Sequence, residues 1–401
     1  MEPTGNARVS PARTGGGGPN RNRVSRRDFL GRTSAAMASA ALAAPLAIAQ
    51  TPQAPFRIVL IGTGGRLNAL LTTILAQPNV EIVACADILP MNLNRTLDRV
   101  EQATGKRPEG LTGEKDYLKL LRRDDVQGAV SACPCDLHAP IYLEALRQNK
   151  HMYGEKPLCL TRAECRELEA AQKESKAFLQ IGFQRRVSVR YMEGIRRIRE
   201  GEIGVPMEGH AAWNNTGGPL GVGRWLNYRE RSGDWMLEQA CHTWDVLFWV
   251  AGRLPLRAYG VGRGDVFKDV APDRTVTDYY IATLEYPDGL LINYNHTWSA
   301  PRNDNGAFGG VFERIAGLKG GIDLSAGRIS FTDADRPPEL IEPREPNHTT
   351  VSVEHFFECV REGKPPLSGV ENGVAATLTG LLVRKAVYEH RRVEMEEILQ
   401  G

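Results

Sequence analysis

The fold is decided by the stretch Phe56-Arg57-Ile58-Val59-Leu60-Ile61-Gly62-Thr63-Gly64-Gly65-Arg66-Leu67. Its apolar, β-branched first half predicts a buried strand. The glycines then predict a tight turn, and residues 68–77 have a helical pattern. A second strand is expected at 81–86 and is followed by Asp87. This order of strand, helix and strand predicts a parallel sheet with crossover helices.

The glycine turn predicts a dinucleotide site. Gly62, Gly64 and Gly65 would let backbone amides and a helix N-terminus approach a pyrophosphate, with Thr63 and Arg66 completing the turn. Leu67 occupies the third glycine position of the usual G-x-G-x-x-G pattern. Asp87, 25 residues after Gly62, places a carboxylate where it would bond ribose hydroxyls and repel a 2′-phosphate. We therefore expect NAD rather than NADP. The alternative is an ordinary strand-to-helix turn with an unrelated aspartate.

The alternation of strands and helices continues to about residue 182. Further strands are expected at 128–132, 151–154 and 178–182, with helices from 91, at 137–148 and at 162–175. After a helix at 188–200, strands follow without long helices between them, at 208–213, 279–286, 290–298 and 311–317. Asp288-Gly289 supplies a hairpin turn, so the second sheet should be largely antiparallel.

The N-terminus has the order of features of an export signal. A Gly- and Arg-rich stretch precedes Ser25-Arg26-Arg27-Asp28-Phe29-Leu30, an apolar run over 33–48 and a small-x-small cleavage site at Ala47-Ile48-Ala49. The paired arginines resemble the signal read by the twin-arginine export machinery, so we expect a periplasmic or otherwise exported protein. The alternative is a disordered basic tail with an Ala-rich helix. No stable membrane insertion is expected after processing.

The expected fold class is α/β, with a Rossmann doubly wound parallel sheet followed by an α+β domain that has a large, mostly antiparallel open sheet. The expected divisions are a signal peptide over 1–49, an NAD-binding domain over 50–182, a substrate and oligomerisation domain over 183–368, and a C-terminal helix over 369–401 that packs back on the body. Gly363-Lys364-Pro365-Pro366 separates the last two helical patterns.

Composition argues against a nucleic-acid partner. The chain has 401 residues, 42% hydrophobic and 24% charged, which is ordinary globular usage in a chain long enough for two domains. The formal charge of +2 is misleading, because residues 1–49 hold seven arginines against two acids and the remainder holds 43 bases against 46 acids. Seven cysteines without a Cys-x-x-Cys pair predict buried thiols and no structural metal.

Two further motifs predict catalytic groups. Gly154-Glu155-Lys156-Pro157 follows a short strand, at the sheet edge where ligands bind. A lysine ammonium there can stabilise a developing alkoxide; the alternative is a surface ion pair. Residues 234–250 predict one helix on which Glu238, His242 and Asp245 share a face. A carboxylate beside an imidazole favours a general base, whereas a lone histidine on an apolar helix is usually a core residue.

These motifs resemble the Gfo/Idh/MocA oxidoreductases, NAD(P)-dependent enzymes that act mostly on sugars and polyols. The resemblance covers nearly everything after residue 55. Its markers are the glycine turn, Glu155-Lys156-Pro157, Gly182-Phe183-Gln184-Arg185-Arg186, the His242-x-x-Asp245 helix and Gly363-Lys364-Pro365-Pro366. Within the family, the chain is similar to exported glucose-fructose oxidoreductase and to NAD-dependent glycosidases of the α-N-acetylgalactosaminidase type.

The resemblance implies catalytic roles. Lys156 would lie between nicotinamide and substrate and orient the hydroxyl that is oxidised, with Glu155 paired to it or on the nicotinamide ribose. His242 would be the acid-base group. Glu238 stands where the family usually has an aspartate, so its role stays open, and Tyr191 is an alternative group for moving an α-proton.

Further side chains are expected around the two ligands. Cys133 and His138 are expected at the cofactor. Guanidinium and amide groups hydrogen-bond hydroxyls, and aromatic faces stack on pyranose rings. On this basis, and by the resemblance, four residues are expected at the substrate: Gln184, Arg185, Trp225 and Asp245. An interdomain brace and core packing are the alternatives.

Export combined with a nicotinamide cofactor constrains the chemistry. No large pool of free cofactor is expected outside the cytoplasm, so NAD should stay tightly bound and be restored within each cycle. We expect an oxidoreductase acting on a small carbohydrate. The alternatives are a redox-neutral NAD-dependent glycosidase and a non-catalytic sugar-binding protein with structural NAD. The open face of the second sheet also predicts a homo-oligomer, either a dimer or a tetramer.

Overall fold

The parallel sheet is centred on β1 (Phe56–Ile61), which pairs in parallel with β2 (Val80–Ala86) and β4 (Gly128–Ser131). The computed structural model describes residues 54–218, 224–302, 307–341 and 346–401. The strand order is β3-β2-β1-β4-β5-β6, which confirms the expected doubly wound Rossmann sheet. Its other elements are β3 (Glu109–Leu111), β5 (His151–Gly154), β6 (Leu179–Ile181), α2 (Gly65–Leu75), α3 (Pro90–Thr104), α4 (Asp116–Leu121), η1 (Cys135–Leu137), α5 (His138–Arg147) and α6 (Arg162–Glu174).

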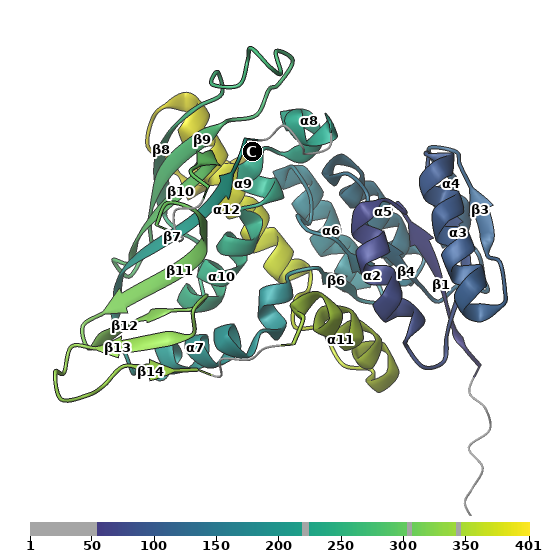
Figure 1. The fold of residues 1–401 in the computed structure, drawn as a ribbon, viewed down its shortest axis with the longest axis horizontal. Coiled ribbons are helices and arrows are strands. Elements are labelled where there is room, and N and C mark those ends of the chain that lie inside the picture. Colours follow the sequence, from purple (N-terminus) through teal and green to yellow (C-terminus); the bar gives the residue numbers. More distant parts are fainter. Residues whose placement is uncertain (1–53, 219–223, 303–306, 342–345) are drawn as a thin grey trace, which may run out of the picture. The chain divides into compact units, whose positions relative to one another are not determined.

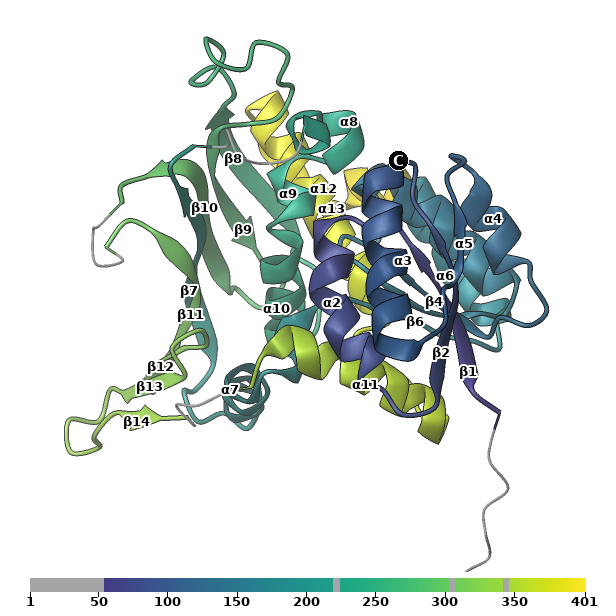
Figure 2. The same cartoon turned by 45° about the vertical axis from the view of Figure 1, so that its right-hand side comes forward.

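Alternate residues of β1 pack on opposite faces of this sheet, as the period of a strand requires. Ile58 and Leu60 join the apolar face of α2 in one core, whereas Val59 and Ile61 join α5 in the other. Figures 1 and 2 show the parallel sheet with its helices, and in Figure 2 α2 and α5 lie on opposite sides of the strands. This double coverage explains the continuous apolar run in the sequence.

The second sheet has nine strands in the order β14-β13-β12-β11-β7-β10-β9-β8-β15. Among the described strands of this second sheet, only β7 and β10 pair in parallel, so the expected, mostly antiparallel sheet is confirmed. Its strands are β7 (Pro206–Thr216), β8 (Arg257–Arg263), β9 (Tyr279–Glu285), β10 (Leu291–Ala300), β11 (Gly310–Gly317), β12 (Gly320–Asp323), β13 (Arg328–Phe331), β14 (Glu339–Leu340) and β15 (Val393–Glu394).

Helices cover one face of the second sheet, which we call the inner face (Figures 1 and 2). Ile292 and Tyr294 of β10 are buried there, whereas Leu291 on the opposite, outer face is 48% exposed. The remaining helical elements are η2 (Gln184–Val187), α7 (Val189–Arg199), η3 (Arg224–Asn227), α8 (Arg229–Ser232), α9 (Trp235–Glu238), α10 (Cys241–Ala251), α11 (His348–Glu362), α12 (Val370–Glu389) and α13 (Met395–Gln400).

The structure confirms the hairpin turn predicted at Asp288-Gly289 but not the helix predicted over 234–250. The hairpin forms with Gly289 at φ +84° and a hydrogen bond from Tyr286 N to Leu290 O of 2.9 Å. The single helix expected over 234–250 is wrong, because the structure divides it into α9 and α10. The long helix α12 packs against α10, β8 and α6, so it contacts elements of both sheets.

The expected export signal and its cleavage site lie outside the described residues. None of the described helices combines the length and the apolar composition needed to cross a membrane.

Candidate functional site

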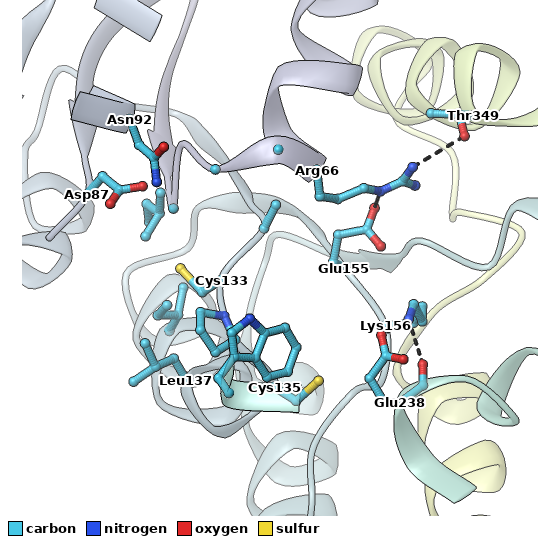
Figure 3. Close-up of a pocket in the computed structure, with 18 of the residues that line it drawn as sticks. Arg66, Asp87, Asn92, Cys133, Cys135, Leu137, Glu155, Lys156, Glu238 and Thr349 are labelled. Atoms are coloured by element: carbon cyan, nitrogen blue, oxygen red, sulfur yellow. Dashed lines mark hydrogen bonds and ion pairs between the residues drawn. The ribbon is translucent and has the colours of Figure 1, made fainter. Parts of the chain in front are cut away.

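A cavity of about 1420 Å³ lies where the carboxyl edge of the parallel sheet meets the inner face of the second sheet. Its walls come from the turn after β1, the ends of β2, β4 and β5, and from η2, β7, the α9–α10 junction and the start of α11. In the view of Figure 3, Asp87 lies at one end and Lys156 with Glu238 at the other, with Arg66 and Glu155 between them. Expected cofactor and catalytic residues, among them Asp87, Lys156 and His242, therefore share one cavity.

The turn after β1 gives the cavity access to a helix N-terminus. Gly62 has φ +75°, and a Cβ there would lie 2.5 Å from Cys133 Sγ, so only glycine fits. Gly64 caps α2 without a side-chain hydrogen bond, and a Cβ on Gly65 would meet nothing within 4 Å. The first amides of α2 are therefore accessible from the cavity, which suits a diphosphate.

Asp87, which also lines the cavity, is held in place by the same turn. Its Oδ2 accepts from Thr63 N at 2.6 Å and Thr63 Oγ1 at 3.0 Å, and its Oδ1 accepts from Leu89 N at 2.8 Å. A carboxylate has about four acceptor positions and three are used, so about one, on Oδ1, remains for a ribose hydroxyl. Thr63 thus orients Asp87 from behind, and Leu67 is buried in the core under α2 rather than at the cavity.

Arg66 connects the glycine turn to the loop after β5. Its Nε donates to Glu155 Oε1 at 2.7 Å, and Nη1 lies 3.5 Å from Thr349 Oγ1 at the start of α11 (Figure 3). The Glu155 side chain is 6% exposed and that of Arg66 is 36% exposed, so the carboxylate is shielded from solvent but the guanidinium only partly so. Three segments distant in the sequence are joined at this point of the cavity wall.

His138 lies behind the cavity wall. Its Nδ1 contacts Pro157 O at 2.6 Å and its Nε2 contacts Cys133 O at 3.0 Å. Tyr142 beside it donates to Glu155 O at 2.6 Å. The histidine therefore ties the loop after β4 to the loop after β5, and Cys133, which lines the cavity, is its neighbour there.

Lys156 forms an ion pair with Glu238 at the end of α9. Its Nζ donates to Glu238 Oε1 at 2.7 Å and to Glu238 O at 2.6 Å. Burial is the largest influence on the Lys156 pKa and lowers it, but Glu238 and two neighbouring thiols together raise it above the usual value. The ammonium therefore stays charged, and Glu238 aims it at the cavity that both residues line.

His242, in the first turn of α10, lines the same cavity and is 9% exposed. Its ring stacks on Trp213 with centroids 5.7 Å apart. Burial, and then the positive charges of Lys156, Arg185 and Arg66, hold its pKa well below 6.5. The imidazole is therefore neutral near pH 7 and has a lone pair that can accept a proton.

Glu238 and Asp245 do not accompany His242 as the sequence predicted. The break between α9 and α10 gives Glu238 to Lys156 instead of to the imidazole. Asp245 is fully buried away from the cavity, and its carboxylate accepts from Arg186 Nε and Nη2 at 2.8 to 3.0 Å. The break separates Glu238 from His242, whereas Asp245 shares α10 with His242 but is held by Arg186.

Gln184, Arg185 and Trp225 line the cavity, as expected for substrate residues. Arg185 is held from behind by Glu313 of β11, whose Oε1 lies 2.7 Å from its Nη1. Tyr191 is buried outside the cavity lining and donates to Glu313 Oε2 at 2.7 Å.

Gln239 at this wall and Glu313 behind it are among the residues that the sequence did not indicate as site residues. Glu313 could have been found from the sequence, because it occupies a core-facing position in the alternating strand β11 where an apolar residue is expected.

Among the described residues, no group of three His, Cys, Asp or Glu side chains is arranged to hold a metal ion. The absence of a structural metal stays a prediction.

A Rossmann sheet whose glycine turn and acidic strand end open into a cavity shared with a second α/β domain defines a class, the dinucleotide-binding enzymes. The chain belongs to the Gfo/Idh/MocA oxidoreductase family: residues 56–183 match its NAD-binding Rossmann fold and residues 195–395 its C-terminal alpha/beta domain. The glycine turn, α2 and Asp87 fit NAD, so the protein is an NAD-binding oxidoreductase of this family.

Three known proteins are similar to this chain. It is 25% identical over 278 residues to scyllo-inositol 2-dehydrogenase (NAD(+)) of Bacillus subtilis (strain 168), covering 66% of this chain and 78% of that protein. It is 33% identical over 159 residues to a glycosyl hydrolase family 109 protein of Saccharopolyspora erythraea, covering 39% of this chain and 34% of that protein. Its fold matches the crystal structure of scyllo-inositol dehydrogenase from Lactobacillus casei with bound NAD(H) and scyllo-inositol, with a TM-score of 0.69 and 16% identity over 85% of this chain and 99% of that one.

Proposed function

We propose that the protein oxidises a secondary hydroxyl group of a sugar or cyclic polyol and passes the hydride to tightly bound NAD. The observation that carries the proposal is the Lys156–Glu238 ion pair in the cavity that also holds the neutral His242. These are the two groups that alcohol oxidation needs, a fixed positive charge and a proton acceptor. The inositol dehydrogenase relative supports the polyol as substrate class.

Each group has one task in the reaction. When bound, NAD supplies the hydride acceptor. The Lys156 ammonium donates to the hydroxyl oxygen and stabilises the negative charge that develops there. His242 takes the hydroxyl proton, and the hydrogen on carbon leaves with its electron pair, so that the substrate becomes a ketone. Glu238 keeps Lys156 charged and in place, and Gln184, Arg185 and Trp225 contact the substrate.

The test is a panel of scyllo-inositol, myo-inositol, D-glucose and D-fructose added to the NAD-loaded protein, with NADH absorbance as the signal. Lys156→Met and His242→Asn should each lower kcat/KM by roughly 10²- to 10⁴-fold, the usual contribution of a proton-transfer or charge-stabilising group. His355→Asn is the matched control, because His355 lies on α11 outside the cavity lining. Full activity in Lys156→Met would overturn the assignment, and sugar binding without any NADH would favour a non-catalytic protein.

A redox-neutral glycosidase is the second candidate, supported by the relative of glycosyl hydrolase family 109. It would oxidise a sugar hydroxyl, expel the glycosidic group after loss of the α-proton, add water and reduce the ketone again. Tyr191 is a poor α-proton base here, because it donates to Glu313 and burial raises its pKa. Release of phenol from aryl glycosides without added cofactor would establish this candidate, and its absence across several sugars would exclude it.

We also propose that the cofactor is loaded before export and regenerated in place. The support is the N-terminal sequence pattern, in which paired arginines precede an apolar run and a cleavage site. The measurement is to recover the mature protein from the periplasm, denature it and identify the released dinucleotide. Stoichiometric NAD is expected. Cofactor-free protein, or protein retained in the cytoplasm with its N-terminus intact, would contradict the proposal.

A further inference from the structure

Gln239 lies at the junction of α9 and α10 and lines the cavity beside Glu238. Its side-chain oxygen already has two partners: Oε1 is 2.9 Å from Asn215 Nδ2 and 2.8 Å from His296 Nε2. Its Nε2 donates to no atom of the described residues and is not enclosed by the protein. One end of this amide is therefore fixed, and the other end is directed to the cavity.

The orientation of the amide follows from one group that can only donate. The oxygen and nitrogen of a side-chain amide have nearly the same shape, so their assignment must come from their partners. The indole Nε1 of Trp213 has a hydrogen and no lone pair, and it lies 3.2 Å from Asn215 Oδ1. Asn215 must therefore turn its NH₂ group to Gln239. Gln239 in turn must accept with its oxygen, which leaves its NH₂ group facing the cavity.

The same reasoning assigns the tautomer of His296. Gln239 Oε1 can only accept, so His296 must carry its hydrogen on Nε2. Its Nδ1 is buried without a hydrogen-bond partner among the described residues, as a ring nitrogen without hydrogen can be. The ring is packed nearly parallel between Trp235 (8°) and Tyr280 (7°). Burial lowers the His296 pKa to about 3, so the ring stays neutral and keeps this tautomer.

Strand register explains why these residues meet. β7 and β10 pair in parallel with Trp213 opposite His296, so both side chains lie on the inner face. Asn215 is two residues beyond Trp213 on β7, which places it on that face as well. The break between helices α9 and α10, which follows Glu238, then brings Gln239 against this face. The arrangement is set by the sheet rather than by the flexible ends of surface side chains.

We propose that Gln239 is a substrate-binding residue that donates its amide hydrogens to an oxygen of the sugar or polyol, with Asn215 and His296 as the positioning residues that hold it in this orientation. This inference rests on the proposed function. Glu238, the preceding residue, uses Oε1 for Lys156, which leaves Oε2 as an acceptor at the same wall. A donor and an acceptor on adjacent residues match a hydroxyl group, which accepts one hydrogen bond and donates another. We therefore infer that the substrate has a second hydroxyl group beside the one that is oxidised.

The kinetic test uses Gln239→Glu, which retains both accepted hydrogen bonds and replaces the cavity-facing NH₂ by an oxygen, and Gln239→Met, which is uncharged. The probes are scyllo-inositol, myo-inositol and D-glucose with their monodeoxy analogues. Both variants should raise KM roughly 10- to 100-fold with kcat within about threefold, because one buried hydrogen bond to substrate is lost. For the analogue that lacks the accepting hydroxyl, variant and wild type should have the same KM. An equal loss with every analogue would overturn the inference.

A second measurement does not depend on turnover. Nitrogen-15 NMR of the NAD-loaded protein should show His296, assigned by its contacts with the Trp235 and Tyr280 rings, with hydrogen on Nε2. Asn215→Asp places a carboxylate against Gln239, which must then turn its NH₂ group away from the cavity, so the His296 hydrogen should move to Nδ1. Hydrogen on Nδ1 in the wild type would overturn the orientation even if Asn215→Asp does not fold. Failure of every sugar to give NADH would instead contradict the proposed function, while the tautomer still decides the orientation of Gln239.

Discussion

His242 sets the acid limit expected for activity, because a proton acceptor works only while it is unprotonated. Burial and the neighbouring cations hold its pKa well below 6.5. As the pH falls through 6.5, an ordinary histidine becomes protonated but His242 does not, so activity should persist and be lost only at a lower pH. The pH profile of kcat/KM for the NAD-loaded enzyme measures this limit. An acid limb at or above 6.5 would be inconsistent with His242 as the base.

Glu238 should set the alkaline limit through Lys156. Removing its charge in Glu238→Gln keeps the size of the side chain but leaves burial, which lowers the lysine pKa, as the dominant influence. The Lys156 pKa should fall below 10.5, so ammonium-dependent activity should acquire a basic limb that the wild type lacks. Glu155→Gln is the matched control, because Glu155 lines the same cavity but pairs with Arg66. The same new limb in both variants would contradict the specific role of Glu238.

Gly62 tests the cofactor turn, and Gly105 provides a control. Both have positive φ, but a Cβ at Gly105 meets nothing within 4 Å, whereas one at Gly62 meets Cys133 Sγ. Gly105→Ala should therefore lower the free energy of unfolding by about 1 kcal/mol, from backbone strain alone. Gly62→Ala should lower it further and weaken NAD binding, and adding Cys133→Ala should recover part of the loss. Urea unfolding and NAD titration measure both quantities; equal losses in the two alanine variants would show that the contact with Cys133 does not matter.

At the scale of elements, the buried pair Arg186–Asp245 joins η2 to α10. Asp245→Asn leaves the guanidinium buried without its counter-charge, which typically costs about 3–5 kcal/mol in the free energy of unfolding. Since Asp245 does not line the cavity, KM should stay close to the wild-type value. The control Arg186→Met with Asp245→Leu replaces the pair by apolar groups and should recover much of the stability. A raised KM with unchanged stability would restore Asp245 as a substrate residue.

The elements that sequence reasoning could predict are those with a strong local pattern. β1 and β2 have apolar runs, and their positions agree with expectation. The single C-terminal helix expected over 369–401 is wrong, because α12 ends at Glu389 and is followed by β15 and α13. Strands β12 to β15 have four residues or fewer, too few for a pattern. At the break between α9 and α10, Lys156, 82 residues away, donates to the carbonyl oxygen of Glu238. A periodicity along the chain cannot reveal such a donor.

The site residues also divide into those that the sequence could predict and those that it could not. Asp87 and Lys156 could be placed from sequence because parallel strands end at one edge of a sheet, where their loops meet. Asp245 could not, because both faces of α10 are largely buried and the sequence does not say which faces the cavity. Gln239 could not either, since its role depends on the register between β7 and β10. Residues at strand ends are predictable, whereas residues that meet through packing between domains are not.

At the scale of the whole molecule, the outer face of the second sheet exposes a stripe of apolar side chains. Tyr259, Val261, Ile281 and Leu291 are between 43% and 56% exposed there, and Val261 is paired directly with Ile281 across β8 and β9. We propose that a second copy of the chain covers this face, because a two-fold axis can bring the same apolar stripe of each copy together.

The oligomeric state tests this proposal. The wild type should elute as a dimer or tetramer by size-exclusion chromatography with light scattering, and Ile281→Lys should shift it toward the monomer, because a charge would be buried in the contact. NAD binding should remain, since the cavity opens on the inner face. Leu318→Lys changes an apolar residue that is 63% exposed in the turn between β11 and β12, away from Ile281, and should leave the assembly intact. A monomeric wild type, or equal dissociation in both variants, would show that this face is not the interface.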